Sequence, residues 1–217
     1  MENLFPAPWS LSGKGYILLY KFNKTFVESL KDLPSFLKGS FKGGIGSIML
    51  VDYSVSNAGP YSELLFIPGS FLHHGKKLKT ISKIYVSTIE SVVNGRRNWG
   101  IPKEQADFTF KSYDDGKTEQ IHVFSGNNTI ADFTIQAGKV PFPVNTKLLP
   151  FPLVQSYEEQ YYYTSFSGNG TGKLAKVKDI RMNPKLFPDV SGIRPLAAIK
   201  VDPFKITFPI PRIEPCG

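Results

Sequence analysis

Glycine and proline are spread along the whole chain, and this distribution restricts what the chain can fold into. There are 19 glycines and 17 prolines among 217 residues. Because both residue types interrupt helices and strands, they divide the sequence into short segments. They do not gather into one linker, so we expect residues 1–217 to form a single domain. Such frequent interruption favours β structure over long helices.

The segments between these interruptions carry the pattern of strands. Apolar and polar residues alternate along a half-buried strand, because successive side chains face opposite sides of a sheet. Ten segments alternate in this way or are rich in β-branched and aromatic residues: 16–22, 46–53, 62–67, 79–86, 106–113, 120–124, 129–135, 159–167, 172–180 and 205–210. They predict an α+β fold dominated by β structure, with room for two or three short helices.

Two helices are predicted between these strands. Residues 24–33 place four apolar side chains at helical spacing before Pro34, and these are Phe26, Val27, Leu30 and Leu33. Proline cannot continue a helix, so we expect this one to stop there. The second helix is predicted to begin at Ser87, which forms a capping-box pattern with Glu90. We expect it to end at Gly95, because glycine suits a left-handed C-terminal cap.

The cysteine and histidine content excludes several kinds of site. Cys216 is the one cysteine, and there are three histidines. A disulfide framework needs paired cysteines, and a structural zinc site takes four Cys or His ligands. We therefore expect no disulfide, no metal and no cofactor.

The chain is basic, with a formal net charge of +8. Such a charge permits contact with nucleic acid or an anionic membrane. In residues 173–181, however, lysines alternate with apolar residues, as on the outer face of a strand. We expect a solvated face and no nucleic-acid partner; a basic nucleic-acid-binding barrel is the less favoured alternative. Residues 1–10 lack the pattern of a secretory signal, and no segment is long and apolar enough to span a bilayer. No membrane partner and a cytoplasmic location are therefore expected.

The most informative segment is residues 95–104 (GRRNWGIPKE), in which Lys103 follows Trp99, a glycine, an isoleucine and a proline. If Lys103 faces inward, desolvation disfavours its ammonium form and makes the amine more nucleophilic, as Schiff-base chemistry requires. The alternative is an exposed loop lysine with apolar neighbours. The same segment offers Trp99 and Arg96 as candidate substrate-binding side chains.

This segment resembles the Gly-Arg-Glu-x-x-x-x-Pro-Lys-Lys motif of the acetoacetate decarboxylase family, and four residues match it without a gap: Gly95, Arg96, Pro102 and Lys103. Upstream, residues 59–68 are similar to the family's Tyr-x-Glu strand through Tyr61 and Glu63. Residues 170–174 and 187–190 resemble later family segments more loosely. The resemblance implies an antiparallel, barrel-like sheet around an apolar cavity, a Schiff base on the first lysine of the motif and assembly into a homo-oligomer.

The sequence also departs from the family pattern. Glu104 stands where the family has its second lysine, and a carboxylate there would stabilise the ammonium form of Lys103 if it lay nearby. Arg97 replaces a glutamate of the motif. The turn at residues 13–15 offers only Lys14 where the family has an active-site arginine, and Ile48 lies near the position of a second carboxylate.

These residues predict a lyase-type enzyme for a small keto acid. Lys103 would attack the carbonyl of a β-keto or α-keto acid, and decarboxylation or an aldol-type step would follow. Glu63 would act as the general acid and base, and Tyr61, Arg96, Trp99 and Lys14 would contact the substrate. The alternative is a non-catalytic protein of the same fold that binds a keto acid or a small apolar ligand.

Overall fold

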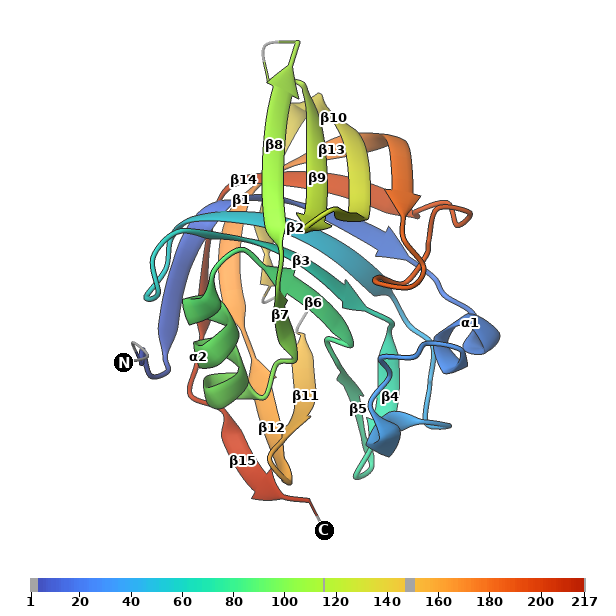
Figure 1. Ribbon diagram of the computed structural model, residues 1–217, viewed down its shortest axis with the longest axis vertical. Coiled ribbons are helices and arrows are strands. Elements are labelled where there is room, and N and C mark those ends of the chain that lie inside the picture. Colours follow the sequence, from blue (N-terminus) through green and yellow to red (C-terminus); the bar gives the residue numbers. More distant parts are fainter. Residues whose placement is uncertain (1–3, 115, 147–150, 217) are drawn as a thin grey trace.

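The computed structural model describes residues 4–114, 116–146 and 151–216. Most of them belong to strands, and ten strands form one curled sheet that resembles half of a barrel (Figure 1). The strand order is β7-β6-β3-β2-β1-β14-β13-β10-β9-β8, and every neighbouring pair is antiparallel except β6 and β7. Their bounds are β1 Trp9–Tyr20, β2 Gly46–Val55, β3 Tyr61–Ile67, β6 Lys83–Val86, β7 Lys103–Gln105, β8 Asp107–Tyr113, β9 Thr118–Ser125, β10 Asn128–Asn145, β13 Ser167–Met182 and β14 Ala197–Phe208.

Five shorter strands form a second sheet, which lies below the large sheet in the view of Figure 1. Its order is β15-β12-β11-β5-β4, with a parallel contact between β11 and β5. The bounds are β4 Ser70–His73, β5 Lys76–Lys79, β11 Pro152–Tyr157, β12 Gln160–Ser165 and β15 Arg212–Pro215. Three helical segments complete the fold: α1 Lys24–Glu28, the 3-10 turn η1 Ser35–Leu37 and α2 Ile89–Trp99. None of the helices in the described part of the chain is long and apolar enough to cross a membrane.

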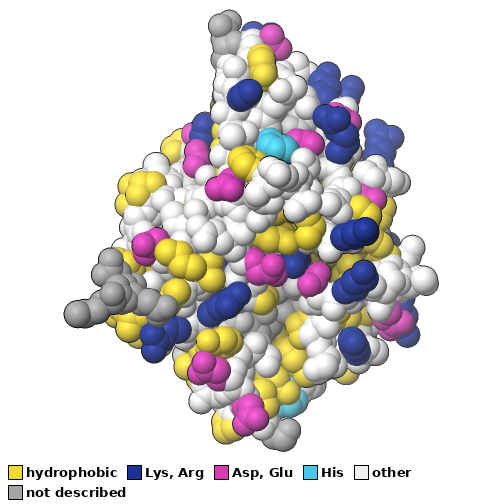
Figure 2. Space-filling view, viewed as in Figure 1, with side chains coloured by type: hydrophobic (Ala, Val, Ile, Leu, Met, Phe, Trp, Pro, Cys, Tyr) yellow, Lys and Arg dark blue, Asp and Glu magenta, His cyan; other side chains and the backbone are white. Residues whose placement is uncertain are grey.

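The large sheet separates two apolar clusters. Along β3, Leu64 and Phe66 belong to one cluster, whereas Tyr61, Leu65 and Ile67 belong to the other. This division follows from the alternation of side chains along a strand. The first cluster packs against α1 and the β8–β10 strands, and the second surrounds the cavity described below. At the surface, basic side chains are interspersed with acidic ones on the face shown in Figure 2.

The predicted β-dominated fold is confirmed, and all ten predicted segments overlap strands. Segment 79–86 proved wrong as one strand, because it spans the end of β5 and the whole of β6, which belong to different sheets. Strands β4, β7, β11 and β15 were not predicted. They are three to six residues long, and such short runs carry little periodicity.

The prediction of a helix over residues 24–33 was wrong in its length, because α1 ends at Glu28. The hydroxyl of Ser29 donates to the carbonyl of Phe26 at 2.8 Å, a local bond that competes with continued helix. The chain then continues in three-residue turns, in which Leu30 N donates to Val27 O and Leu33 N to Leu30 O. The apolar spacing therefore reflects how these turns pack, not a long helix.

Both predicted ends of the second helix were also wrong. Thr88 is the N-cap and its side chain accepts from Ser91 N, whereas the hydroxyl of Ser87 accepts from Ser62 N on β3 at 2.8 Å. The helix passes through Gly95 and ends at Trp99, where Gly100 adopts the left-handed conformation with φ of 64°. Local cap signals could not distinguish these neighbouring serine, threonine and glycine positions.

Gly100→Ala should destabilise the protein by more than the ~1–2 kcal/mol that left-handed backbone costs an L-residue. An added Cβ would also lie 2.9 Å from Cδ2 of Tyr162. The matched control is Gly59→Ala, since Gly59 has φ of 84° but open space around it. Urea unfolding should show the larger loss for Gly100→Ala; equal losses would show that the Tyr162 contact is unimportant.

Candidate active site

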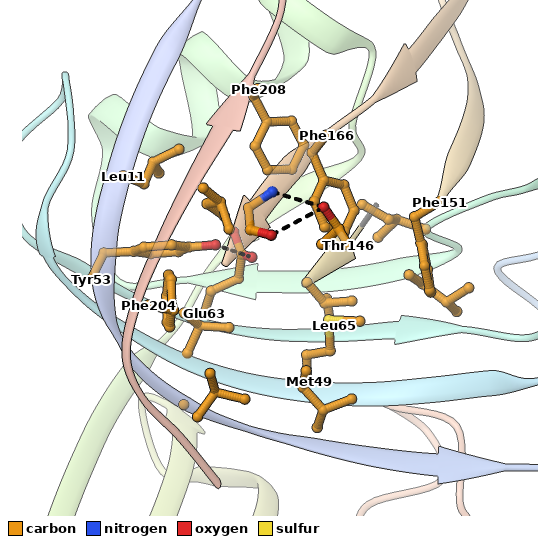
Figure 3. A pocket seen from close by; sticks show the side chains of 18 of the residues that line it. Leu11, Met49, Tyr53, Glu63, Leu65, Thr146, Phe151, Phe166, Phe204 and Phe208 are labelled. Carbon is orange, nitrogen blue, oxygen red and sulfur yellow. Dashed lines mark hydrogen bonds between the residues drawn. The ribbon is translucent and has the colours of Figure 1, made fainter. Parts of the chain in front are cut away.

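One face of the large sheet borders a cavity of about 230 Å³ (Figure 3). Most of the residues that line it are apolar, including Leu11, Met49, Val51, Leu65, Ile84, Trp99, Phe151, Phe166, Phe204 and Phe208. Charged groups are rare in the lining. Among the described residues they are only Glu63, on β3, and Lys103, on β7. An apolar cavity with a few convergent polar groups is the usual form of a small-molecule site.

Lys103 faces inward and is 3% exposed. Its Nζ lies 3.0 Å from Oε2 of Glu63, 3.0 Å from Oγ of Ser91 and 3.5 Å from the hydroxyl of Tyr61. It also lies 4.9 Å from the centre of the Tyr61 ring. These contacts bring together three elements, because Ser91 belongs to α2, Tyr61 and Glu63 to β3 and Lys103 to β7. They satisfy the donors of the ammonium group inside the protein.

The alternation of β7 separates Lys103 from Glu104. Lys103 is buried and Glu104 is exposed, because successive strand residues face opposite sides. Glu104 Oε1 instead lies 2.7 Å from Nζ of Lys83, on the neighbouring strand β6. The carboxylate that replaces the family's second lysine is thus paired outside the cavity.

Helix α2 presents a narrow face to the Lys103 side chain. Ser91 and Gly95 are four residues apart, which places them on the same face of the helix. A Cβ at position 95 would lie 2.5 Å from Cδ and 2.8 Å from Cε of Lys103. Gly95 therefore leaves the space through which the lysine reaches Ser91. Arg96 fixes the other end of this lysine, since its Nε donates to the backbone carbonyl of Lys103 at 2.9 Å.

Glu63 is 5% exposed and is surrounded by phenols. The hydroxyl of Tyr53 lies 3.4 Å from Oε1 of Glu63, as Figure 3 shows, and the rings of Tyr53 and Tyr61 are 4.7 Å apart. Burial, followed by the charge of Glu63, holds the pKa of both phenols well above the ordinary value. Tyr53 and Tyr61 consequently remain protonated hydrogen-bond donors at neutral pH.

The structure brings four of the six predicted site residues to the cavity, and these are Lys103, Glu63, Tyr61 and Trp99. Trp99 packs edge-on against Trp9, with ring centres 5.2 Å apart, and Nε1 of Trp99 donates a hydrogen bond to the carbonyl of Pro209. Arg96 and Lys14 are not among the lining residues. Nζ of Lys14 lies 3.6 Å from Oε1 of Glu119, and the carboxylate of Glu119 also accepts a hydrogen bond from the hydroxyl of Tyr16. No arginine lines the cavity within the described chain.

Sequence reasoning missed Ser91 and Tyr53. Ser91 follows the capping signal by a few residues, and nothing local marks it as a partner of a lysine 12 residues later. Tyr53 is two residues from Val51 on β2, so their side chains lie on the same face of the sheet. That Tyr53 stands opposite Tyr61 depends on the register between β2 and β3, which the local sequence does not reveal. Ile48 is buried in the other cluster, whereas the adjacent Met49 lines the cavity. In residues 4–114, 116–146 and 151–216, no three His, Cys, Asp or Glu side chains are grouped to hold a metal ion.

Comparison with known families identifies the chain. The family model described as acetoacetate decarboxylase (ADC) matches residues 3–177. The chain belongs to the acetoacetate decarboxylase family. A search of curated proteins found no match.

Solved structures share the fold of this family member at low sequence identity. Acetoacetate decarboxylase from Legionella pneumophila subsp. pneumophila str. Philadelphia 1 has a TM-score of 0.71 and 13% identity, with 96% of this chain and 88% of that chain covered. An acetoacetate decarboxylase-like enzyme from Sphingomonas wittichii RW1 has a TM-score of 0.73 and 11% identity, covering 97% and 94%. The enduracididine biosynthesis enzyme MppR, complexed with pyruvate, has a TM-score of 0.64 and 12% identity, covering 96% and 91%.

Lys103→Met alone should lower the free energy of unfolding by about 3–5 kcal/mol, because it leaves the buried carboxylate of Glu63 without a charge partner. Replacing both residues, as Glu63→Leu with Lys103→Met, should recover most of this loss. Urea unfolding of the two single variants and the double variant measures the coupling.

Lys83→Met is the matched control for this pair. Lys83 is itself buried, but its partners Asp32 and Glu104 are about half-exposed and remain hydrated without it, so its loss should cost less than the loss of Lys103. A double variant that is less stable than both single variants would contradict the role assigned to the pair.

Proposed function

We propose that this protein is an enzyme that acts on a small keto acid through an imine on Lys103. The observation that carries the proposal is the buried amine of Lys103, which lies 3.0 Å from the carboxylate of Glu63 at the wall of an apolar cavity. A lysine becomes a nucleophile when it is desolvated and has a base within hydrogen-bond reach. Lys103 is 3% exposed, and the carboxylate of Glu63 both pairs with its ammonium group and lies within reach to accept its proton.

The first step is formation of the imine. The ammonium of Lys103 gives one proton to Glu63, and the neutral amine attacks the carbonyl carbon of the substrate. Protonated Glu63 then returns its proton as the carbinolamine oxygen departs as water. The products are a protonated imine, one water molecule and the carboxylate of Glu63. Ser91 holds Nζ in place during this exchange, since its Oγ lies 3.0 Å from it.

Decarboxylation is the step that the cavity favours next. The electron pair of the bond to the carboxylate moves onto the imine nitrogen, and carbon dioxide leaves. The enamine takes one proton at carbon, delivered through Glu63 from water, and hydrolysis of the new imine releases a ketone. This step removes a negative charge from apolar surroundings. An α-keto acid would keep its carboxylate throughout, and no arginine of the described lining is available to bind it.

An aldol-type step is the related chemistry. MppR has been solved with pyruvate and with the condensation product of pyruvate and imidazole 4-carboxaldehyde. Here Glu63 would remove a proton from the carbon next to the imine, and the enamine would attack an aldehyde. Release of carbon dioxide distinguishes this reaction from decarboxylation. A cytoplasmic location and a homo-oligomeric state stay predictions.

A second candidate function is a non-catalytic binding protein of the same fold. It is favoured by the apolar lining and by Glu104, which stands in place of the family's second lysine and pairs with Lys83. Such a protein would bind a keto acid or an apolar ligand without forming a covalent bond.

Incubation with acetoacetate and sodium borohydride should give a reduced covalent adduct, detected by intact-protein mass. Peptide mapping should place the adduct on Lys103, so the test does not depend on a variant that folds poorly. The adduct should be lost in Lys103→Met and in the double variant with Glu63→Leu, and kept in Lys83→Met. No adduct with acetoacetate or pyruvate between pH 6 and 9 would favour the binding protein.

Gly95→Ala should slow adduct formation by about 10–100-fold, since a displacement of a reacting group by about 1 Å can cost this much. The new Cβ would occupy the path of the Lys103 side chain. Helix propensity alone favours alanine over glycine by about 1 kcal/mol, so the fold should persist. Arg97→Ala, an exposed change on the same helix, is the control. Equal rates of adduct formation in the unchanged protein, Gly95→Ala and Arg97→Ala would show that Gly95 does not set the path of the Lys103 side chain.

A further inference from the structure

The cavity continues beyond the Lys103 and Glu63 pair along the sheet. Alternate residues of β3 line it from Tyr61 through Glu63 and Leu65 to Ile67. A strand rises about 3.4 Å per residue, so the lining extends roughly 14 Å from Glu63 to Ile67. Past Glu63 this side of β3 carries only apolar side chains.

Strand register extends this apolar region across the sheet. Leu65 is paired with Met49, Met49 with Ile17 and Ile17 with Ile199, and all four residues line the cavity. We call these four residues the apolar row. Its member on β3, Leu65, is two residues or roughly 7 Å along the strand from Glu63. A ligand held at Lys103 therefore has an apolar floor beside it that spans four strands.

Three aromatic side chains outside the apolar row also face the cavity. Figure 3 shows Phe166, Phe208 and Phe151 together at one side of it. The rings of Phe166 and Phe208 are stacked with centres 5.1 Å apart, and those of Phe151 and Phe166 are 5.6 Å apart. With the apolar row, these rings form walls that suit hydrocarbon rather than a charged or hydrated group.

The size of the cavity exceeds what acetoacetate requires. Its volume of about 230 Å³ corresponds to roughly eight water molecules at about 30 Å³ each. Acetoacetate has seven non-hydrogen atoms that are covalently joined and so fill less space than separate waters. A methyl group at the carbonyl would leave the apolar row without a partner, whereas a longer chain would cover it.

We propose that the substrate is a β-keto acid whose carbonyl carries an apolar chain longer than methyl, and that this chain lies over the apolar row. The inference rests on the proposed function, because it takes Lys103 as the residue that binds the carbonyl. Decarboxylation would break the bond between the carboxylate and its carbon, release carbon dioxide, and leave a methyl ketone after one proton is taken up. The apolar chain of the substrate does not react.

Turnover of a homologous series tests this substrate class. Carbon dioxide release is measured with acetoacetate, β-ketohexanoate and β-ketooctanoate, each corrected for its spontaneous decay. Each buried methylene should raise kcat/KM about fourfold, the ratio that follows from the transfer of one CH₂ out of water. The inference is overturned if acetoacetate is turned over as well as, or better than, its longer homologues.

A pair of methionine variants tests where the apolar chain of the substrate lies. Met49→Phe reduces the space above the apolar row. It should lower the ratio of kcat/KM for β-ketooctanoate to kcat/KM for acetoacetate by at least tenfold. Met182→Phe makes the same change in a half-buried methionine that packs against the other apolar cluster, so it should leave the ratio unchanged. An unchanged ratio in Met49→Phe would place the chain elsewhere and contradict the inference.

Binding of the product class separates this inference from the proposed function. Trp9 and Trp99 line the cavity, so methyl ketones from acetone to nonan-2-one should quench tryptophan fluorescence with an affinity that rises with chain length. The variant with Glu63→Leu and Lys103→Met should keep this trend, since the chain contacts do not involve the amine. Borohydride adducts of equal yield for all chain lengths, without a trend in ketone affinity, would overturn the substrate class and leave the imine standing. A trend in ketone affinity without any adduct would instead overturn the proposed enzyme and the substrate assignment with it.

Discussion

The ammonium of Lys103 and the carboxylate of Glu63 lie 3.0 Å apart inside an otherwise apolar cavity, and the site depends on this ion pair. Two charges that have left water are stable together only when their geometry is good and their remaining hydrogen-bonding capacity is used. Ser91 and Tyr61 contact the amine, and Tyr53 contacts the carboxylate. These groups come from α2, β2 and β3, so the pair requires the sheet and the α2–β7 connection to be assembled.

The connection between α2 and β7 also determines which acidic group the lysine contacts. Gly95 and Ser91 leave room for the Lys103 side chain on the helix, and strand alternation turns Glu104 outward to Lys83. The departure from the family motif therefore changes the outer surface of the strand rather than the cavity. Inside, Glu63 is the one acidic side chain in the described lining, which makes proton exchange between two defined groups possible.

Much of the fold was predictable from local patterns, and the reasons are visible in particular elements. Segments 46–53 and 62–67 contain short apolar runs bounded by polar residues, which is typical of strands buried on both faces, and β2 and β3 were expected to within two residues at each end. The ends of α2 were not, because Ser87 and Gly95 carry cap signals but serve a neighbouring strand and the path of Lys103 instead. Lys103, Glu63, Tyr61 and Trp99 were predicted and do line the cavity, whereas Arg96 and Lys14 lie outside it.

The sequence by itself determined the β-rich fold class and the family motif around Lys103, because strand patterns and short motifs are properties of neighbouring residues. Only the tertiary structure decided which distant groups meet. It placed Ser91 against Lys103, brought Met49 beside Ile17 and Leu65, and paired Glu104 with Lys83. These contacts depend on strand register and on the packing of a helix against a sheet, which link segments far apart in the chain and leave no mark in local sequence.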